Sequence, residues 1–226
     1  MSSPLRDQSQ SHSSTLLERL ELFCDYCGVK VVGLTGGIAS GKSTVAKILE
    51  RLGAAIVNAD VLAREVVEPG QDGWKEIVAK FGPEVLQSDQ TLDRQKLRTT
   101  IFNNPEARKT LEAIIHPRVR ALAERRIREY GDAGHEIVVY EVPLLFEGNL
   151  QESLRPVILV ACDINVQRRR LEQRDQLDQS AAQKHIDAQM SLEEKRRLAD
   201  YVIENDRSLA DLERQVTEVL NKIRAT

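Results

Sequence analysis

The sequence predicts an α/β fold, in which a doubly wound, five-stranded parallel sheet carries a helical insertion and a helical lid. Two observations predict it. Short apolar runs rich in β-branched residues recur between longer helical patterns, and the runs are continuously apolar, as is typical of strands covered on both faces. These runs lie at 29–34, 54–57, 137–140, 157–160 and 201–203.

The first apolar run leads directly into a glycine-rich segment, residues 36–43, which reads Gly-Gly-Ile-Ala-Ser-Gly-Lys-Ser. This matches the pattern G-x-x-x-x-G-K-[ST] of a phosphate loop, whose glycines let successive backbone N–H groups wrap a phosphate chain. An exposed Lys42 is expected to neutralise the β- and γ-phosphates, and the Ser43 hydroxyl is the expected Mg²⁺ ligand. The predicted triphosphate-binding residues of this loop are Gly37, Ile38, Ala39, Ser40, Gly41, Lys42, Ser43 and Thr44.

A helix is predicted to follow the loop from Thr44, so that its positive dipole end points at the anion. The apolar run at 54–57 then closes a βαβ unit. The strand before the loop and the helix after it therefore favour a nucleoside triphosphate site over a glycine-rich turn that binds no ligand.

Two segments between the strands are predicted to be helical. Residues 60–130 show no convincing strand but helical patterns at 92–102 and 105–130, so they form the insertion. Residues 164–199 are dense in charge and form either two solvated helices or a mobile lid whose arginines close on ATP and exclude water. An amphipathic helix at 209–223 closes the chain, and the core comprises about 29–59, 131–163 and 200–226.

Composition narrows the class of protein further. With 226 residues, a net charge of −3 and 30% charged residues, the chain has room for one α/β domain and lacks the basic character of a general nucleic-acid binder. Since no apolar stretch approaches the roughly 20 residues of a membrane span, a soluble protein with no membrane partner is expected. The sequence leaves the oligomeric state open.

Residues 1–28 are expected to form a flexible extension with a short helix at 16–23. They are rich in Ser and Gln, and acidic residues interrupt the only apolar stretch, so neither a secretory signal nor a transit peptide is indicated and the cytoplasm is the default. Cys24 and Cys27 form one C-x-x-C, either a zinc or redox pair or two ordinary reduced thiols, since no second pair lies at ligand spacing. Cys162 is expected to be a small core residue.

Six segments, running in order from residue 29 to the C-terminus, resemble the dephospho-coenzyme A kinase family. They read GLTGGIASGKST at 33–44, AD and AR within 59–64, IHP at 115–117, VPLLFE at 142–147, RLEQRD at 170–175 and ADYVIEN at 199–205. The resemblance implies phosphoryl transfer from ATP to the ribose 3′-hydroxyl of dephospho-coenzyme A, the last step of coenzyme A biosynthesis. It also implies a core that carries ATP, a helical substrate domain at about 60–130 and a lid at about 164–199.

Phosphoryl transfer requires that two substrates be placed in line, that charge be neutralised and that water be excluded. Asp60 follows the second strand, at the edge of the sheet where acceptors bind, so its carboxylate is the predicted base for the 3′-hydroxyl; the alternative is a helix N-cap. Arg64, one turn further, either pairs with Asp60 or touches the substrate. Asn58 stands where the family more often has Asp, so a contact of that carboxylate with a Mg²⁺-bound water or the substrate is not implied here; the amide can hydrogen-bond but brings no charge.

Three further charged residues are candidates for ATP and its metal. Glu141 ends the third strand and either holds a Mg²⁺-bound water or is a surface charge. Arg174 is the best lid candidate, because its planar guanidinium can clamp phosphate oxygens bidentately. Arg170, one turn earlier, either supports Arg174 or is part of a plain exposed helix face.

His116 either touches the acceptor or is a structural hydrogen-bonder, and Asn205 either reads the adenine of ATP or is an ordinary turn residue. Two other functions stay open. One is a kinase for another small acceptor, such as a nucleoside monophosphate. The other is a regulatory nucleotide switch or ATPase, although no guanine-reading N-K-x-D motif occurs. Dependence of ATP turnover on a small acceptor distinguishes them.

Overall fold

A computed structural model describes residues 28–102 and 104–226 of the chain. The short helix predicted at 16–23 and the pair Cys24 and Cys27 lie outside the described residues. Among those residues, no helix combines the length and the apolar character that crossing a membrane requires.

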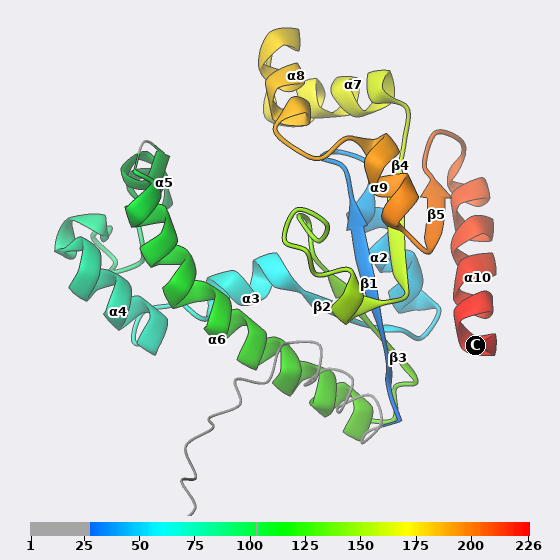
Figure 1. Cartoon of the computed structure of the whole chain (residues 1–226), viewed down its shortest axis with the longest axis horizontal. Helices are drawn as coiled ribbons and strands as arrows, with labels where there is room; N and C mark the ends of the chain where they lie inside the picture. The colour runs from blue at the N-terminus through cyan, green and yellow to red at the C-terminus, as the bar shows by residue number, and fades with distance from the viewer. Residues whose placement is uncertain (1–27, 103) are drawn as a thin grey trace, which may run out of the picture.

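The centre of the fold is a five-stranded, entirely parallel sheet of order β2-β3-β1-β4-β5 (Figure 1). The strands are β1 (Lys30–Gly36), β2 (Ala55–Asn58), β3 (Ile137–Glu141), β4 (Val157–Ala161) and β5 (Tyr201–Glu204). Each lies within a residue or two of a predicted apolar run, so the fold prediction is confirmed. β3 and β4 are buried at every position, which explains why their sequences are continuously apolar.

Two apolar layers cover the two faces of the sheet. One face, with Val32 and Leu34 of β1, packs against α2 (Lys42–Arg51) and α10 (Leu209–Ala225). The other, with Val31 of β1, packs against α6 (Pro105–Asp132) and against the chain that follows β3. Successive β1 residues face opposite layers because the strand has a side-chain period of two. The sheet is therefore doubly wound, as predicted.

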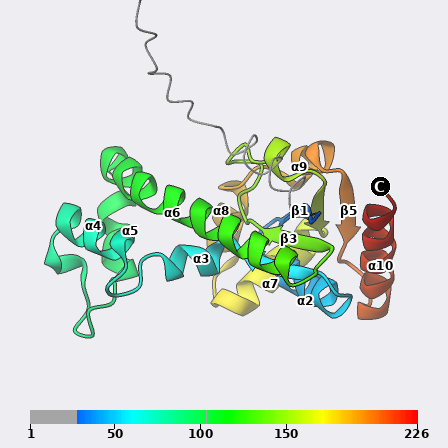
Figure 2. The same cartoon turned by 90° about the horizontal axis from the view of Figure 1, so that it is seen from below.

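The predicted helical insertion projects away from the sheet (Figures 1 and 2). It contains α3 (Ala59–Glu65), α4 (Asp72–Phe81), the 3₁₀ turn η1 (Pro83–Val85), α5 (Arg94–Phe102) and the long α6. α5 begins two residues later than predicted, because Leu92 forms a bridge with Leu86 instead. α6 runs from the tip of the insertion back to β3, which ties the insertion to the core (Figure 1).

The segment between β4 and β5 contains three helices, α7 (Ile164–Asp175), α8 (Gln179–Asp187) and α9 (Leu192–Leu198), so the alternative of two solvated helices is wrong. α7 and α8 lie at the top of Figure 1, above the sheet, whereas α9 lies beside β4. Lys195 of α9, which the charge pattern placed on a polar surface, is fully buried. The third helix is therefore attached to the core by its packing.

Candidate active site

The phosphate loop, residues 36–43, connects β1 to α2 at the carboxyl edge of the sheet. Gly41 is the N-cap of α2 and has φ of 94°, a left-handed conformation that favours glycine. This turn starts the helix at Lys42, two residues earlier than predicted, so Lys42 and Ser43 lie in its first turn. Among the described residues, no protein acceptor takes the N–H groups of Gly41, Lys42 and Ser43, whereas that of Thr44 donates to Gly41 at 2.9 Å.

Close packing beneath the loop also requires glycine at position 37. A Cβ there would lie 2.6 Å from Nε2 of Gln167 and 3.1 Å from Cδ2 of Leu192. Gln167 belongs to α7 and is 2% exposed, and Leu192 begins α9. Two elements of the segment between β4 and β5 therefore press against the phosphate loop.

Lys42 forms an ion pair with Glu141, the last residue of β3. The two side chains are only 15% and 5% exposed, so the expectation of an exposed Lys42 is wrong, and so is the alternative that Glu141 is a surface charge. The other carboxylate oxygen of Glu141 accepts a hydrogen bond from Asn58 Nδ2 at 2.5 Å. Asn58 and Glu141 are paired in the register of β2 and β3, so sheet pairing itself brings them together.

Asn58 is also the N-cap of α3, because its Oδ1 accepts a hydrogen bond from the N–H of Val61 at 3.1 Å. The alternative role of Asp60 as a cap is therefore wrong. Asp60 lies in the first turn of α3 and is exposed, as is Arg64 one turn later. No ion pair joins these two side chains among the described residues, so both are available for a substrate.

Arg170 and Asn205 converge on the backbone of the phosphate loop. Asn205, which follows β5, donates from Nδ2 to the carbonyl oxygen of Ser40 at 2.8 Å. Arg170 of α7 donates to the same carbonyl at 3.4 Å and to the carbonyl of Asn205 at 3.0 Å. A Cβ at Gly41 would lie 2.0 Å from Asn205 Nδ2, so the Asn205 side chain packs closely against the loop at this glycine. Both side chains hold the loop, and the alternative of a plain exposed helix face for Arg170 is wrong.

Among the described residues, Arg174 and His116 form no hydrogen bond or ion pair with the phosphate loop. Arg174 forms a bidentate pair with its neighbour Asp175, with both N–O distances at 2.8 Å, and this hydrogen bonding raises the pKa of Arg174 and lowers the pKa of Asp175. His116 is exposed on α6, one residue before Pro117 inside that helix. Both side chains are accessible to an incoming ligand.

The arrangement at the start of α2 fits a phosphate chain. Unsatisfied N–H groups at a helix N-terminus, together with the nearby Lys42 ammonium, form an anion site. It also fits Mg²⁺, which usually takes one or two protein oxygens and completes its shell with water and phosphate. The exposed hydroxyl of Ser43 and the carboxylate of Glu141 are the oxygens that would serve. Among the described residues, no cluster of three or more His, Cys, Asp or Glu side chains offers an all-protein metal site.

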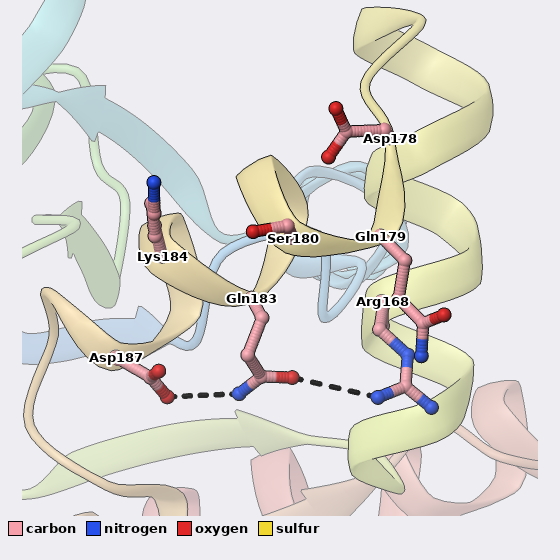
Figure 3. A pocket seen from close by; sticks show the side chains of 7 residues that line it. All are labelled: Arg168, Asp178, Gln179, Ser180, Gln183, Lys184 and Asp187. Atoms are coloured by element: carbon pink, nitrogen blue, oxygen red, sulfur yellow. Dashed lines mark hydrogen bonds between the residues drawn. The ribbon is translucent and has the colours of Figure 1, made fainter.

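Other features of the described chain lie apart from this site. A hollow of about 670 Å³ between α7 and α8 is lined by Arg168, Asp178, Gln179, Ser180, Gln183, Lys184 and Asp187 (Figure 3). None of these is a predicted site residue. Cys162 directly follows β4 and is 1% exposed, which confirms it as a core residue, and burial raises the pKa of its thiol to about 11. Burial likewise raises the pKa of Tyr140 to about 12.

Sequence reasoning missed polar residues that lie around the phosphate loop and the return of the segment between β4 and β5 to the core. These are Glu147, Gln167, Gln189 and Lys195. Glu147 stood at the end of the VPLLFE segment with no role of its own, and Lys195 stood in a run of charges. Only the acidic end of an otherwise apolar segment hinted that Glu147 has a buried partner.

A parallel sheet with a phosphate loop after its central strand, an acid at the end of the neighbouring strand and a helical insertion together define a P-loop kinase. The dephospho-CoA kinase family profile matches residues 30–211 of this chain. The chain belongs to that family.

Individual relatives agree with this assignment. A dephospho-CoA kinase of Geobacter sulfurreducens is 45% identical over 194 residues, covering 86% of this chain and 98% of that protein. A dephospho-CoA kinase domain-containing protein of Danio rerio is 46% identical, covering 85% of each chain.

Solved structures show the same relationship in three dimensions. A Thermus thermophilus protein superimposes with a TM-score of 0.74 at 36% identity, covering 86% of this chain and 98% of its own. A dephospho-CoA kinase from Campylobacter jejuni gives a TM-score of 0.59 at 30% identity, with 87% and 98% covered.

Proposed function

We propose that this protein catalyses the ATP-dependent phosphorylation of the ribose 3′-hydroxyl of dephospho-CoA, giving CoA and ADP. The observation that carries the proposal is the family match across residues 30–211, which spans the core, the helical insertion and the lid. The phosphate loop and the exposed Asp60 at the same edge of the sheet supply the chemistry that this reaction needs.

The triphosphate of ATP is proposed to bind along the phosphate loop. The N–H groups of Gly41, Lys42 and Ser43 are open to phosphate oxygens, and the Lys42 ammonium neutralises negative charge as the γ-phosphoryl group moves. Arg170 and Asn205 hold the loop conformation through their hydrogen bonds to the Ser40 carbonyl oxygen. Arg174 is proposed to leave Asp175 and clamp the phosphates when the lid closes.

Mg²⁺ is the proposed metal partner of ATP, held by the Ser43 hydroxyl with Glu141 nearby. When bound there, the metal would supply positive charge that offsets the negative charge of the phosphates during transfer. Because Glu141 now pairs with Lys42 and Asn58, its carboxylate is already oriented at the end of β3.

The acceptor is proposed to lie between the phosphate loop and the helical insertion. The bond between the γ-phosphorus and the β,γ-bridging oxygen breaks, and the 3′-oxygen of the ribose forms the new bond to phosphorus. Asp60 accepts the hydroxyl proton. Arg64, on the same helix as Asp60, and His116, on α6, are the proposed contacts for the rest of the acceptor.

The cytoplasm remains the predicted compartment, from the character of residues 1–28.

The experiment that tests the proposal measures ADP release from Mg²⁺-ATP by the full chain. Dephospho-CoA is compared with adenosine, uridine and cytidine monophosphates, shikimate and gluconate, and mass spectrometry checks that the acceptor gains one phosphoryl group. Turnover with dephospho-CoA alone is the expected result. Turnover with another acceptor alone would keep the kinase class and overturn the substrate, and acceptor-independent ATP hydrolysis would favour a nucleotide switch.

A further inference from the structure

A buried ion pair lies where the segment between β4 and β5 returns to the core. Lys195 of α9 is 0% exposed, and its Nζ lies 2.8 Å from Oε1 of Glu147, in the turn after β3. The two groups are in ion-pair contact, and the Lys195 ammonium forms no hydrogen bond among the described residues. A fully buried lysine is rare and needs a negative partner, so Glu147 fixes where α9 can sit.

The same carboxylate also holds the connection between α8 and α9. Glu147 Oε1 accepts a hydrogen bond from the N–H of Met190 at 3.0 Å. The preceding residue, Gln189, extends its side chain to the phosphate loop, where its Oε1 accepts a hydrogen bond from the N–H of Ile38 at 2.9 Å. One carboxylate therefore fixes the backbone from which Gln189 reaches the loop.

The Ile38 N–H lies next to a residue whose backbone is unusual. Ala39 has φ of 59°, in the left-handed region that a residue with a Cβ adopts only at a cost in free energy. That conformation persists only if its surroundings hold it. The Gln189 hydrogen bond holds the loop immediately before Ala39, and Leu192 packs against Gly37 beside it.

We infer that Gln189 is a positioning residue for ATP, a latch that links the lid to the phosphate loop and is itself anchored by the Glu147–Lys195 pair. This inference rests on the proposed function. It predicts that ordering the loop with ATP also orders the connection between α8 and α9. The latch acts through the Ile38 backbone and does not touch the triphosphate.

The first test follows the Ile38 amide by hydrogen exchange in the full chain without nucleotide. Gln189→Ala is expected to speed exchange at Ile38 about 5-fold and to weaken ATP binding by a similar factor, the net effect of one hydrogen bond. Gln189→Glu keeps an acceptor, so Ile38 stays protected, while its negative charge repels the triphosphate and weakens ATP binding more than Gln189→Ala does. A merely structural glutamine would not separate these two readouts.

The matched control is Gln183→Ala, a glutamine of α8 whose hydrogen bonds to Arg168 and Asp187 stay between α7 and α8 (Figure 3). It is expected to leave both Ile38 exchange and ATP binding at parent values. Parent-rate exchange at Ile38 in Gln189→Ala would overturn the latch, as would an equal acceleration in the Gln183→Ala control.

The anchor is tested with Glu147→Gln, which leaves the Lys195 ammonium buried without a counter-charge. It is expected to speed Ile38 exchange as Gln189→Ala does, although Glu147 does not contact the loop. The double variant Glu147→Gln/Lys195→Met removes the ion pair without leaving a charge buried alone, so it is expected to recover stability but to keep the faster Ile38 exchange.

If Glu147→Gln does not fold, the double variant decides alone, and parent-like protection of Ile38 in that variant would overturn the anchor. These measurements use ATP without acceptor. A working latch in a protein that does not phosphorylate dephospho-CoA would therefore count against the proposed function only.

Discussion

The Lys42 ammonium and the Glu141 carboxylate form an ion pair at the carboxyl edge of the sheet, where the first turn of α2 meets the end of β3. Both side chains are largely shielded from water. Lys42, which is proposed to neutralise the triphosphate, is thus paired with Glu141, which is proposed to lie near the metal. Changes to either residue affect stability as well as chemistry.

The ion pair predicts that Lys42→Ala loses stability together with activity. Turnover is expected to fall at least about 100-fold, as when one transition-state donor is removed. The free energy of unfolding is expected to fall by about 1–3 kcal/mol, because the Glu141 carboxylate loses its cation in a shielded place. Urea unfolding and steady-state kinetics measure the two effects.

The double variant Lys42→Ala/Glu141→Gln is expected to recover most of the stability and none of the turnover. Lys47→Ala, on the exposed side of α2, is the control and should match the parent in both. Parent-like turnover in Lys42→Ala would contradict the phosphate-loop assignment.

Asp60→Asn is expected to lower kcat by about 10²–10⁴-fold, because the variant lacks the carboxylate that accepts the proton of the acceptor hydroxyl. The acceptor KM should change little. Since Asn58 caps α3 and Asp60 is exposed, the free energy of unfolding should change by no more than about 0.5 kcal/mol. Glu68→Gln, an exposed acid just after α3, is the control; a kcat for Asp60→Asn equal to that of Glu68→Gln would leave Asp60 with no catalytic role.

Asn58→Asp is expected to destabilise the protein by about 1–3 kcal/mol, although Asp caps helices as well as Asn does. The substitution removes the Nδ2 donor that lies 2.5 Å from Glu141 and places two carboxylates together. Adding Glu141→Gln exchanges donor and acceptor and should return most of the lost stability in urea unfolding. Equal stability of Asn58→Asp and the parent would show that this hydrogen bond contributes nothing.

Arg174→Ala is expected to lower kcat by about 10²–10³-fold without changing stability, if its guanidinium neutralises charge in the transition state. Its present partner, Asp175, is its neighbour in sequence, and both side chains are more than one-third exposed. Arg169→Ala, an exposed arginine on the same helix, is the control and should retain parent kinetics. A kcat for Arg174→Ala equal to that of Arg169→Ala would remove Arg174 from the mechanism.

Cys162 is expected to resist alkylation by iodoacetamide at pH 8 in a Cys24→Ser/Cys27→Ser background. Burial raises its pKa to about 11, so the folded state keeps the thiol protonated and only about one molecule in a thousand carries the thiolate at that pH. The reactivity of the Cys162 thiol should rise as the pH approaches 11. In urea at pH 8, where the chain is unfolded, the thiol should be fully accessible to labelling. Rapid labelling of the folded protein, followed by mass spectrometry, would show that β4 opens locally.

Much of the fold is readable from local sequence. Continuous apolar runs gave the five strands within a residue or two, since strand burial leaves a local pattern. The phosphate loop was equally readable, because its glycines meet a local backbone requirement, seen at Gly41. The helical insertion was found where strand patterns were missing, although the start of α5 was misplaced by the bridge between Leu86 and Leu92.

The candidate site was readable only in part. The phosphate-loop pattern pointed to Lys42, the position after the second strand to Asp60, and the charged lid to Arg174; their catalytic roles remain predictions. Local sequence left a cap of α3 as the alternative role of Asp60, yet Asn58 caps it, because pairing of β2 with β3 ends that strand one residue before the helix begins. The charge pattern likewise placed Lys195 on the surface, whereas packing of α9 on the core buries it.

The sequence by itself therefore determined the class of fold, the phosphate loop and the family, because each is written in short stretches with their own periodicity or backbone demand. Only the tertiary structure decided which side chains meet. Glu141 reaches Lys42 and Asn58 through strand register, and Gln189 reaches Ile38 across 151 positions of chain. Such contacts depend on how separate elements pack together, and no local pattern of residues carries that information.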